Sequence, residues 1–167
     1  ENLQLSVLYD EVSIRYRKGE AGASFIADCL YGVEKSKAIN DEGHQTCFLQ
    51  MLIMGTTKMG DIEASIHYSE QFIAIEEKRN YLMSIVGASI YLTGLYEKLG
   101  RLKEAEATFL KARDASEKLG DKQSYLVVET RRLYFLLSND LFDDAEKICR
   151  ELFALPELNS IPKIRFE

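Results

Sequence analysis

The 167-residue chain is long enough for one domain with a substantial core, and its 46% hydrophobic content excludes wholesale disorder. It contains only 2 prolines, and because β-sandwiches and barrels depend on many turns marked by Gly and Pro, this composition favours helices. The net charge of −6 repels polyanions, so we expect binding neither to nucleic acid nor to an anionic lipid surface.

The cysteines and the uncharged stretches bound the cellular setting. Cys29, Cys47 and Cys149 are too widely spaced for a CxxC or zinc-ribbon pattern, which indicates buried free thiols in a reducing compartment. The longest uncharged stretch, residues 80–96, is too short and too polar for membrane insertion. Since the sequence begins with Glu1 rather than Met, we expect a fragment of a longer protein. We place it in the cytoplasm and leave the periplasm open.

Apolar residues recur at intervals of three and four along almost the whole chain, the period of helices with one buried face. These runs predict eight helices with short loops, whose apolar residues lie around 3–16, 25–39, 49–56, 62–75, 82–96, 105–115, 126–137 and 141–152. We expect the fourth helix to end near Arg79-Asn80 and the sixth at Leu119-Gly120-Asp121. Breaks such as Lys18-Gly19-Glu20 separate them, and Asn40 or Asp41 is placed to cap the third helix. Residues from 157 onward read either as a tail or as a helix that Pro162 opens or interrupts.

The helix breaks repeat at a fixed interval. They recur every 40 residues, at Glu20, Gly60, Gly100 and Asp140. Apolar positions hold the same register, as Leu52 and Leu92 do. A period of this length is typical of stacked helical units. We therefore predict a single repeat domain with units at 3–41, 42–80, 81–120 and 121–156, followed by a tail at 157–167.

The third unit carries the most specific pattern: Leu92, Thr93, Tyr96, Leu99, Gly100, Ala105, Phe109 and Ala112. This pattern resembles the tetratricopeptide repeat (TPR). The resemblance implies an all-α fold, a right-handed α-α superhelix of about four antiparallel helix pairs. It also implies that Ala105 lets two helices approach closely and that Tyr96 fills the space between helices. The 40-residue unit is longer than the usual 34, and in this it is similar to repeats of bacterial signalling proteins, including GGDEF-associated sensor regions and transcription regulators.

The resemblance further implies that the first helix of each pair lines a concave groove for a protein or an extended or helical peptide. By register, the groove candidates are Arg17, Lys18, Gln50, Met54, Lys58, Ile90, Gly94, Lys98, Thr130 and Tyr134. Among them, Lys18, Lys58 and Lys98 form a ladder with the 40-residue interval. The ladder either binds an acidic peptide or a carboxylate, or complements the negative ends of the helix dipoles.

Two glycines, Gly87 and Gly94, lie inside the fifth predicted helix, where each costs about 1 kcal/mol relative to alanine. Such positions are explained by a ligand that approaches the backbone or by tight packing against a neighbouring unit. Of these two explanations we favour tight packing.

No sequence motif points to chemistry. His44 and His67 have no partners at metal-ligand spacing, and no nucleophile elbow or phosphate loop is present. We expect no enzyme activity, no metal and no cofactor; a catalytic α-domain would require a deep pocket with clustered acids. Two hypotheses remain: a protein- or peptide-binding sensor or scaffold of a bacterial signalling protein such as a GGDEF diguanylate cyclase, or a dimerisation module of a transcriptional regulator with no groove ligand. Residues at the solenoid ends are candidates for a homodimer contact: Leu3, Leu5, Ile161, Ile164 and Phe166.

Overall fold

The computed structural model describes residues 2–154, and this part of the chain is all-α. Its helices are α1 (Asn2–Arg17), α2 (Ala23–Ala38), α3 (Glu42–Met59), α4 (Ile62–Arg79), α5 (Leu82–Lys98), α6 (Leu102–Leu119), α7 (Lys122–Ser138) and α8 (Phe142–Phe153). The prediction of eight helices is confirmed for these residues. The predicted tail, including Ile161, Ile164 and Phe166, lies outside them.

Local capping explains where several helices begin and end. The side chains of Asp41, Asp61 and Asp121 accept the backbone N–H three residues ahead, at 3.0, 3.1 and 2.9 Å, so each satisfies a free donor of the first helical turn. Gly60 and Gly120 end α3 and α6 in the left-handed region, with φ of +80° and +69°. Of the repeated breaks in the sequence, Gly60 is the C-cap of α3, whereas Gly100 and Asp140 lie between the caps of successive helices with φ of +68° and +58°.

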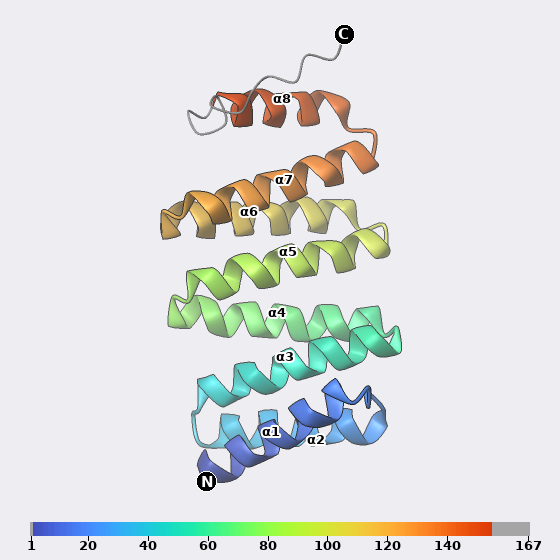
Figure 1. Cartoon of the computed structure of the whole chain (residues 1–167), viewed down its shortest axis with the longest axis vertical. Coiled ribbons are helices and arrows are strands. Elements are labelled where there is room, and N and C mark those ends of the chain that lie inside the picture. The colour runs from blue at the N-terminus through green and yellow to red at the C-terminus, as the bar shows by residue number, and fades with distance from the viewer. Residues whose placement is uncertain (1, 155–167) are drawn as a thin grey trace.

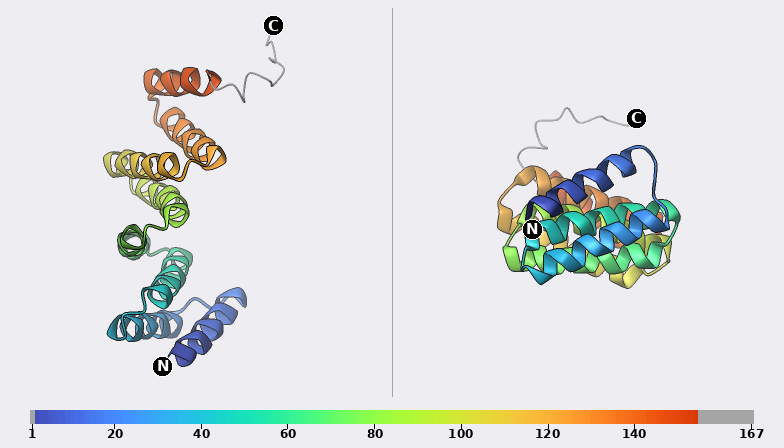
Figure 2. Two further views of the ribbon diagram at one scale, coloured as in Figure 1. Left: turned by 90° about the vertical axis from the view of Figure 1, so that its left-hand side faces the viewer. Right: turned by 90° about the horizontal axis from the view of Figure 1, so that it is seen from below.

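The helices form a stack in which each one packs against the next in the chain (Figure 1). Seen from the side, α1, α3, α5 and α7 form one row, and α2, α4 and α6 form the other (Figure 2). Within the first row, α1 touches α3 and α5 touches α7, but no Cα of α3 comes within 8 Å of a Cα of α5. This separation of α3 from α5 opens a gap above α4.

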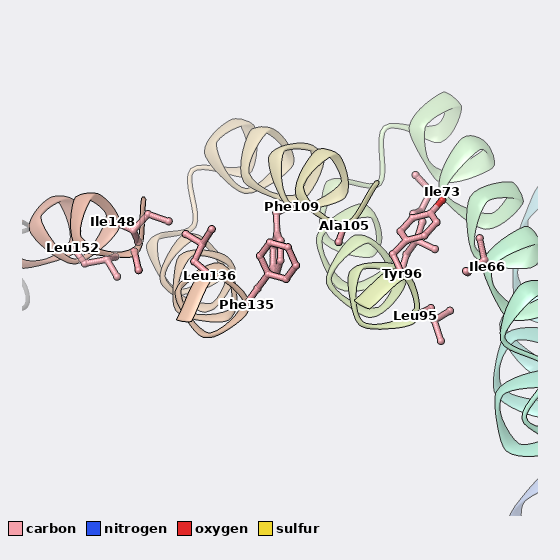
Figure 3. Packing of buried hydrophobic residues seen from close by; sticks show 12 residues of the cluster. Ile66, Ile73, Leu95, Tyr96, Ala105, Phe109, Phe135, Leu136, Ile148 and Leu152 are labelled. Atoms are coloured by element: carbon pink, nitrogen blue, oxygen red, sulfur yellow. The ribbon is translucent and has the colours of Figure 1, made fainter. Parts of the chain in front are cut away.

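The hydrophobic core is spread along the stack rather than gathered at one centre, and its C-terminal part is drawn in Figure 3. There Ala105 is fully buried, and the rings of Phe109 and Phe135 lie 5.4 Å apart between α6 and α7. Tyr96 is 5% exposed and its hydroxyl donates to Glu70 at 2.6 Å. These positions of the third unit therefore hold neighbouring helices together.

Helices α2 and α3 interlock through two phenylalanines, each seated on a glycine of the other helix. A Cβ atom at Gly32 would lie 2.5 Å from the Phe48 ring, and one at Gly55 would lie 2.6 Å from the Phe25 ring. In both helices the phenylalanine precedes the glycine by seven residues, so both lie on one face. These glycines are required because the rings occupy the space of a side chain.

The expectation of tight packing at Gly87 and Gly94 was wrong. Among residues 2–154, no heavy atom beyond the two chain neighbours and the nearby backbone of α5 lies within 4 Å of a Cβ placed at either position. The sequence shows a helical glycine but not whether another helix fills the space above it. The Phe48 ring of α3 fills the space over Gly32, and the Phe25 ring of α2 fills the space over Gly55. The space over Gly87 and Gly94 of α5 stays open.

Candidate protein-binding face

The ten candidate residues all belong to the row of odd-numbered helices or, for Lys18, to the residue directly after α1. Seven of them are exposed, whereas Met54, Ile90 and Gly94 are half-buried. We call the exposed side of α1, α3, α5 and α7 that carries these ten residues the odd-helix face. Two cavities divide it, one on each side of α5.

The first cavity fills the gap between α3 and α5 and has a volume of about 370 Å³. Gln50 and Met54 line it from α3, and Gly87 lines it from α5. Phe72 of α4, which is half-buried, and Ser69 of α4, which is 1% exposed, also line it. The Tyr91 hydroxyl reaches across from α5 and donates to Thr57 Oγ1 at 2.7 Å. The structure therefore brings Gln50 and Met54 together in one cavity with Gly87, over which no described side chain packs.

The second cavity lies between α5 and α7 and has a volume of about 260 Å³. Ile90 and Gly94 line it from α5, and Tyr134 and Arg131 line it from α7. Glu97 lies in the same lining, where burial raises the pKa of its carboxyl and the charge of Arg131 opposes that shift. Ile90, Gly94 and Tyr134 are thus brought together, while Arg17 and Thr130 line neither cavity.

A larger and more polar cavity of about 570 Å³ continues the first one toward the start of α3, sharing Gln50 and Phe72 with it. Its polar groups bind one another. Arg79 pairs with the buried Glu76 at 2.7 Å and lies 4.4 Å from the centre of the Tyr81 ring. Burial raises the pKa of the Cys47 thiol, which keeps this half-buried cysteine protonated. Of the three free cysteines only Cys29 is fully buried, so the expectation of buried thiols holds for one of the three.

Ser6, His44 and Asp41 form a line of hydrogen bonds that no sequence spacing indicated. The Ser6 hydroxyl lies 3.0 Å from His44 Nε2, and Asp41 Oδ2 lies 2.7 Å from His44 Nδ1. Hydrolases order a nucleophile, a base and a carboxylate in this way. Here Asp41 also caps α3, Ser6 also donates to the Asn2 carbonyl at 3.1 Å, and Ser6 lies outside the lining of the three cavities above. The line connects α1 to α3 across 38 residues of chain.

The lysine ladder lies along one edge of the odd-helix face, where α1, α3 and α5 end (Figure 1). Lys18, Lys58 and Lys98 are all exposed, but they are not equivalent. Lys58 Nζ donates to the Gly19 carbonyl at 2.8 Å and lies 5.5 Å from the centre of the Tyr16 ring, so it fastens α3 to the end of α1.

Carboxylates mark the opposite edge of the odd-helix face, where α3 and α7 begin (Figure 1). A backbone hydrogen bond from His44 lowers the pKa of Asp41, and a hydrogen bond from the Ser124 hydroxyl lowers the pKa of Asp121. Both side chains therefore stay ionised at neutral pH. Each edge nevertheless carries charges of both signs, because α4 begins with Asp61 and Glu63 at the lysine edge and ends with Lys78 and Arg79 at the opposite edge.

Comparison with known proteins finds no protein-family model and no curated protein sequence that matches the chain. Within residues 2–154, no helix combines the length and the apolar character needed to cross a bilayer. In the same range, no three His, Cys, Asp or Glu side chains are grouped so that they could hold a metal ion. The case for function therefore depends on the geometry of the odd-helix face.

Proposed function

We propose that this chain is a protein- or peptide-binding module whose partner lies on the odd-helix face. The stack of eight helices and the burial of the third-unit pattern support a TPR-like, right-handed superhelix of four helix pairs. The long units favour a scaffold or sensor role within a bacterial multi-domain signalling protein, for instance one that carries a GGDEF diguanylate cyclase. The chain itself binds and does not catalyse in this proposal.

The observation that carries the proposal is the pair of open spaces over Gly87 and Gly94, which lie in two cavities of one face. Two glycines inside a helix cost together about 2 kcal/mol relative to alanine, and within the described part of the chain no side chain packs over either glycine to offset that cost. Large apolar side chains also stand exposed around α5, including Tyr91 (41%) and Tyr134 (64%). A face that combines apolar anchors with polar and charged groups suits a peptide or protein partner.

A library of random peptides displayed on phage and selected on the purified chain provides the test. The affinity of the enriched peptides is then measured on the wild type, on Gly94→Leu and on Tyr134→Ala. We expect each substitution to weaken binding by about tenfold or more. Ala107→Leu is the control, because it places the same leucine side chain at an exposed alanine of α6 in the other row. Equal affinity of all four proteins would contradict the proposal.

A dimerisation module is the second candidate, and the apolar side chains exposed near the two ends of the stack favour it. Leu3 of α1 is 78% exposed, and Phe142 and Phe153 of α8 are 60% and 71% exposed. Stacked repeats bury such residues only when another surface covers the end. Sedimentation equilibrium decides this candidate: a mass that stays monomeric at all concentrations refutes it, and a dimer that Phe142→Ser dissociates supports it.

A further inference from the structure

We infer that Glu129 is a pH-sensitive switch, which keeps α8 docked on α7 while its carboxyl is protonated and loosens α8 once the carboxyl is ionised. This inference is independent of the odd-helix face, because it concerns the contact that joins the last described helix to the stack (Figure 1). Its physical basis is a carboxyl group that occupies a core position without a hydrogen bond.

Glu129 stands where the preceding units place uncharged core residues. Its counterparts 40 and 80 residues earlier, Ser89 and Leu49, are fully buried, and Glu129 itself is 1% exposed. Within residues 2–154, neither of its carboxylate oxygens accepts a hydrogen bond. Tyr125 lies one helical turn before it on α7 and stays neutral, because burial raises the pKa of its phenol. A buried carboxylate without hydrogen bonds is costly, so this position favours the protonated carboxyl.

Two arginines lie close to Glu129, but both are already engaged by other carboxylates. Arg113 Nε of α6 lies 3.4 Å from Glu129 Oε1 and donates to Glu117 at 2.9 Å. Arg132 Nη1 of α7 lies 3.9 Å from Glu129 Oε2, and its guanidinium donates two hydrogen bonds to Glu106. Three carboxylates thus share two guanidinium groups. The arginines therefore compensate an ionised Glu129 only in part, and burial still raises the pKa of its carboxyl.

On the side of α8, Glu129 meets a like charge. Glu151 of α8 acts on Glu129 through this charge and disfavours its ionisation. The basic side chains of α8, Lys147 and Arg150, are both exposed, and Arg150 pairs with Glu146 at 2.6 Å. Once ionised, Glu129 is therefore attracted toward the arginine of α6 and repelled by the acidic group of α8.

The contact that gives way is that of α8. Among the described helices, α8 packs on α7 alone, whereas α6 packs on both α5 and α7. It is held there through the three residues that it buries, Ala145, Ile148 and Leu152. Local opening begins with the elements that bury the fewest apolar contacts. Loosening α8 lets water hydrate the carboxylate of Glu129 and uncovers the apolar side chains of Ile148 and Leu152.

The direction of the pH effect follows from the two states of Glu129. While α8 is docked, burial raises the pKa of the carboxyl, and when α8 is loosened the carboxyl is hydrated and titrates near its ordinary pKa. The docked form therefore holds a proton at pH values where the loosened form has released it. The ratio of docked to loosened α8 is highest below the ordinary pKa and falls as the pH rises through the raised one, by up to about tenfold per pH unit.

Hydrogen exchange of the full chain in low concentrations of urea, followed for each amide across this pH range, tests the switch. Exchange through local opening depends little on urea, because the opening exposes little surface. We expect the amides of α8 in the wild type to show this weak dependence. Their protection, corrected for the intrinsic effect of pH on exchange, should fall as the pH rises. Glu129→Gln, which cannot ionise, should show no such fall.

Two variants of α8 make the outcome specific. Glu151→Gln removes the like charge and should make the fall in protection smaller, whereas Glu146→Gln, at an exposed position of the same helix, should leave it unchanged. Circular dichroism checks that each variant keeps its fold. The same pH dependence in the wild type and in Glu129→Gln would overturn the switch. Exchange of the α8 amides with the urea dependence of the α3 amides would overturn it as well, because the opening would then be global.

Discussion

Replacing Gly87 and Gly94 together with alanine is expected to stabilise the protein. Both residues lie inside α5, and a Cβ at either position meets no heavy atom within 4 Å. Alanine is more favourable than glycine inside a helix by about 0.8–1.0 kcal/mol, so the double variant should gain about 2 kcal/mol in the free energy of unfolding. For a chain of this size each kcal/mol raises Tm by roughly 2–4 °C, which predicts an increase of about 4–8 °C.

The matched controls are Gly32→Ala and Gly55→Ala. They add the same methyl group to helical glycines, but each methyl would overlap a phenylalanine ring, at 2.5 and 2.6 Å. The overpacking costs typically ~1–3 kcal/mol and outweighs the gain in helix propensity. Both controls should therefore unfold at a lower temperature than the wild type.

Calorimetry and urea unfolding of the four proteins measure these differences directly. A lower Tm for the Gly87→Ala/Gly94→Ala variant would refute the reasoning, because it would show that the space over α5 is filled within the free chain. Equal gains at all four glycines would refute it as well, since propensity alone would then decide the outcome.

Three further perturbations test the buried and capping polar groups. Glu129 is 1% exposed, and burial raises the pKa of its carboxyl. The folded state therefore holds a proton at pH values where the unfolded state has released it. The free energy of unfolding of the wild type falls as the pH rises from the ordinary pKa through the raised one. Urea unfolding across this range should show that the free energy of unfolding of Glu129→Gln rises relative to that of the wild type as the pH rises. The difference should change by up to about 1.4 kcal/mol per pH unit between the two pKa values. If the two proteins show the same dependence of stability on pH, the effect is excluded. Asp41→Ala removes the cap of α3 and should lower the urea midpoint by an amount worth about 1 kcal/mol, whereas Asp41→Asn, which keeps a capping oxygen, should lose less. Lys58→Met removes the bond to the Gly19 carbonyl and should cost about 0.5–1 kcal/mol by the same assay; an equal effect of Lys98→Met would contradict a fastening role for Lys58.

Register placed the ten candidate residues on the odd-numbered helices, but it could not say which of them share a cavity. Gln50 and Met54 meet in one cavity, and Ile90, Gly94 and Tyr134 meet in another, because α3 and α5 are separated while α5 and α7 touch. A 40-residue period predicts identical spacing everywhere and therefore hides this difference between neighbouring units.

The sequence by itself determined the helices and most of their ends. An apolar residue every third or fourth position and an Asp or Gly at the breaks act within one helix or one turn, so they can be recognised without knowledge of any partner element. Gly60, Gly120 and Asp41 were predicted in this way and have these roles in the structure.

Only the tertiary structure decided which surfaces are filled. Gly55 and Gly94 are both glycines inside a helix, yet one holds the Phe25 ring and the other faces open space. The difference lies in the neighbouring helix, whose distance depends on the packing of every side chain between the two axes. For the same reason the sequence could place the ten candidate residues in one row of helices, while the position and size of the cavities beside α5 required the packed stack.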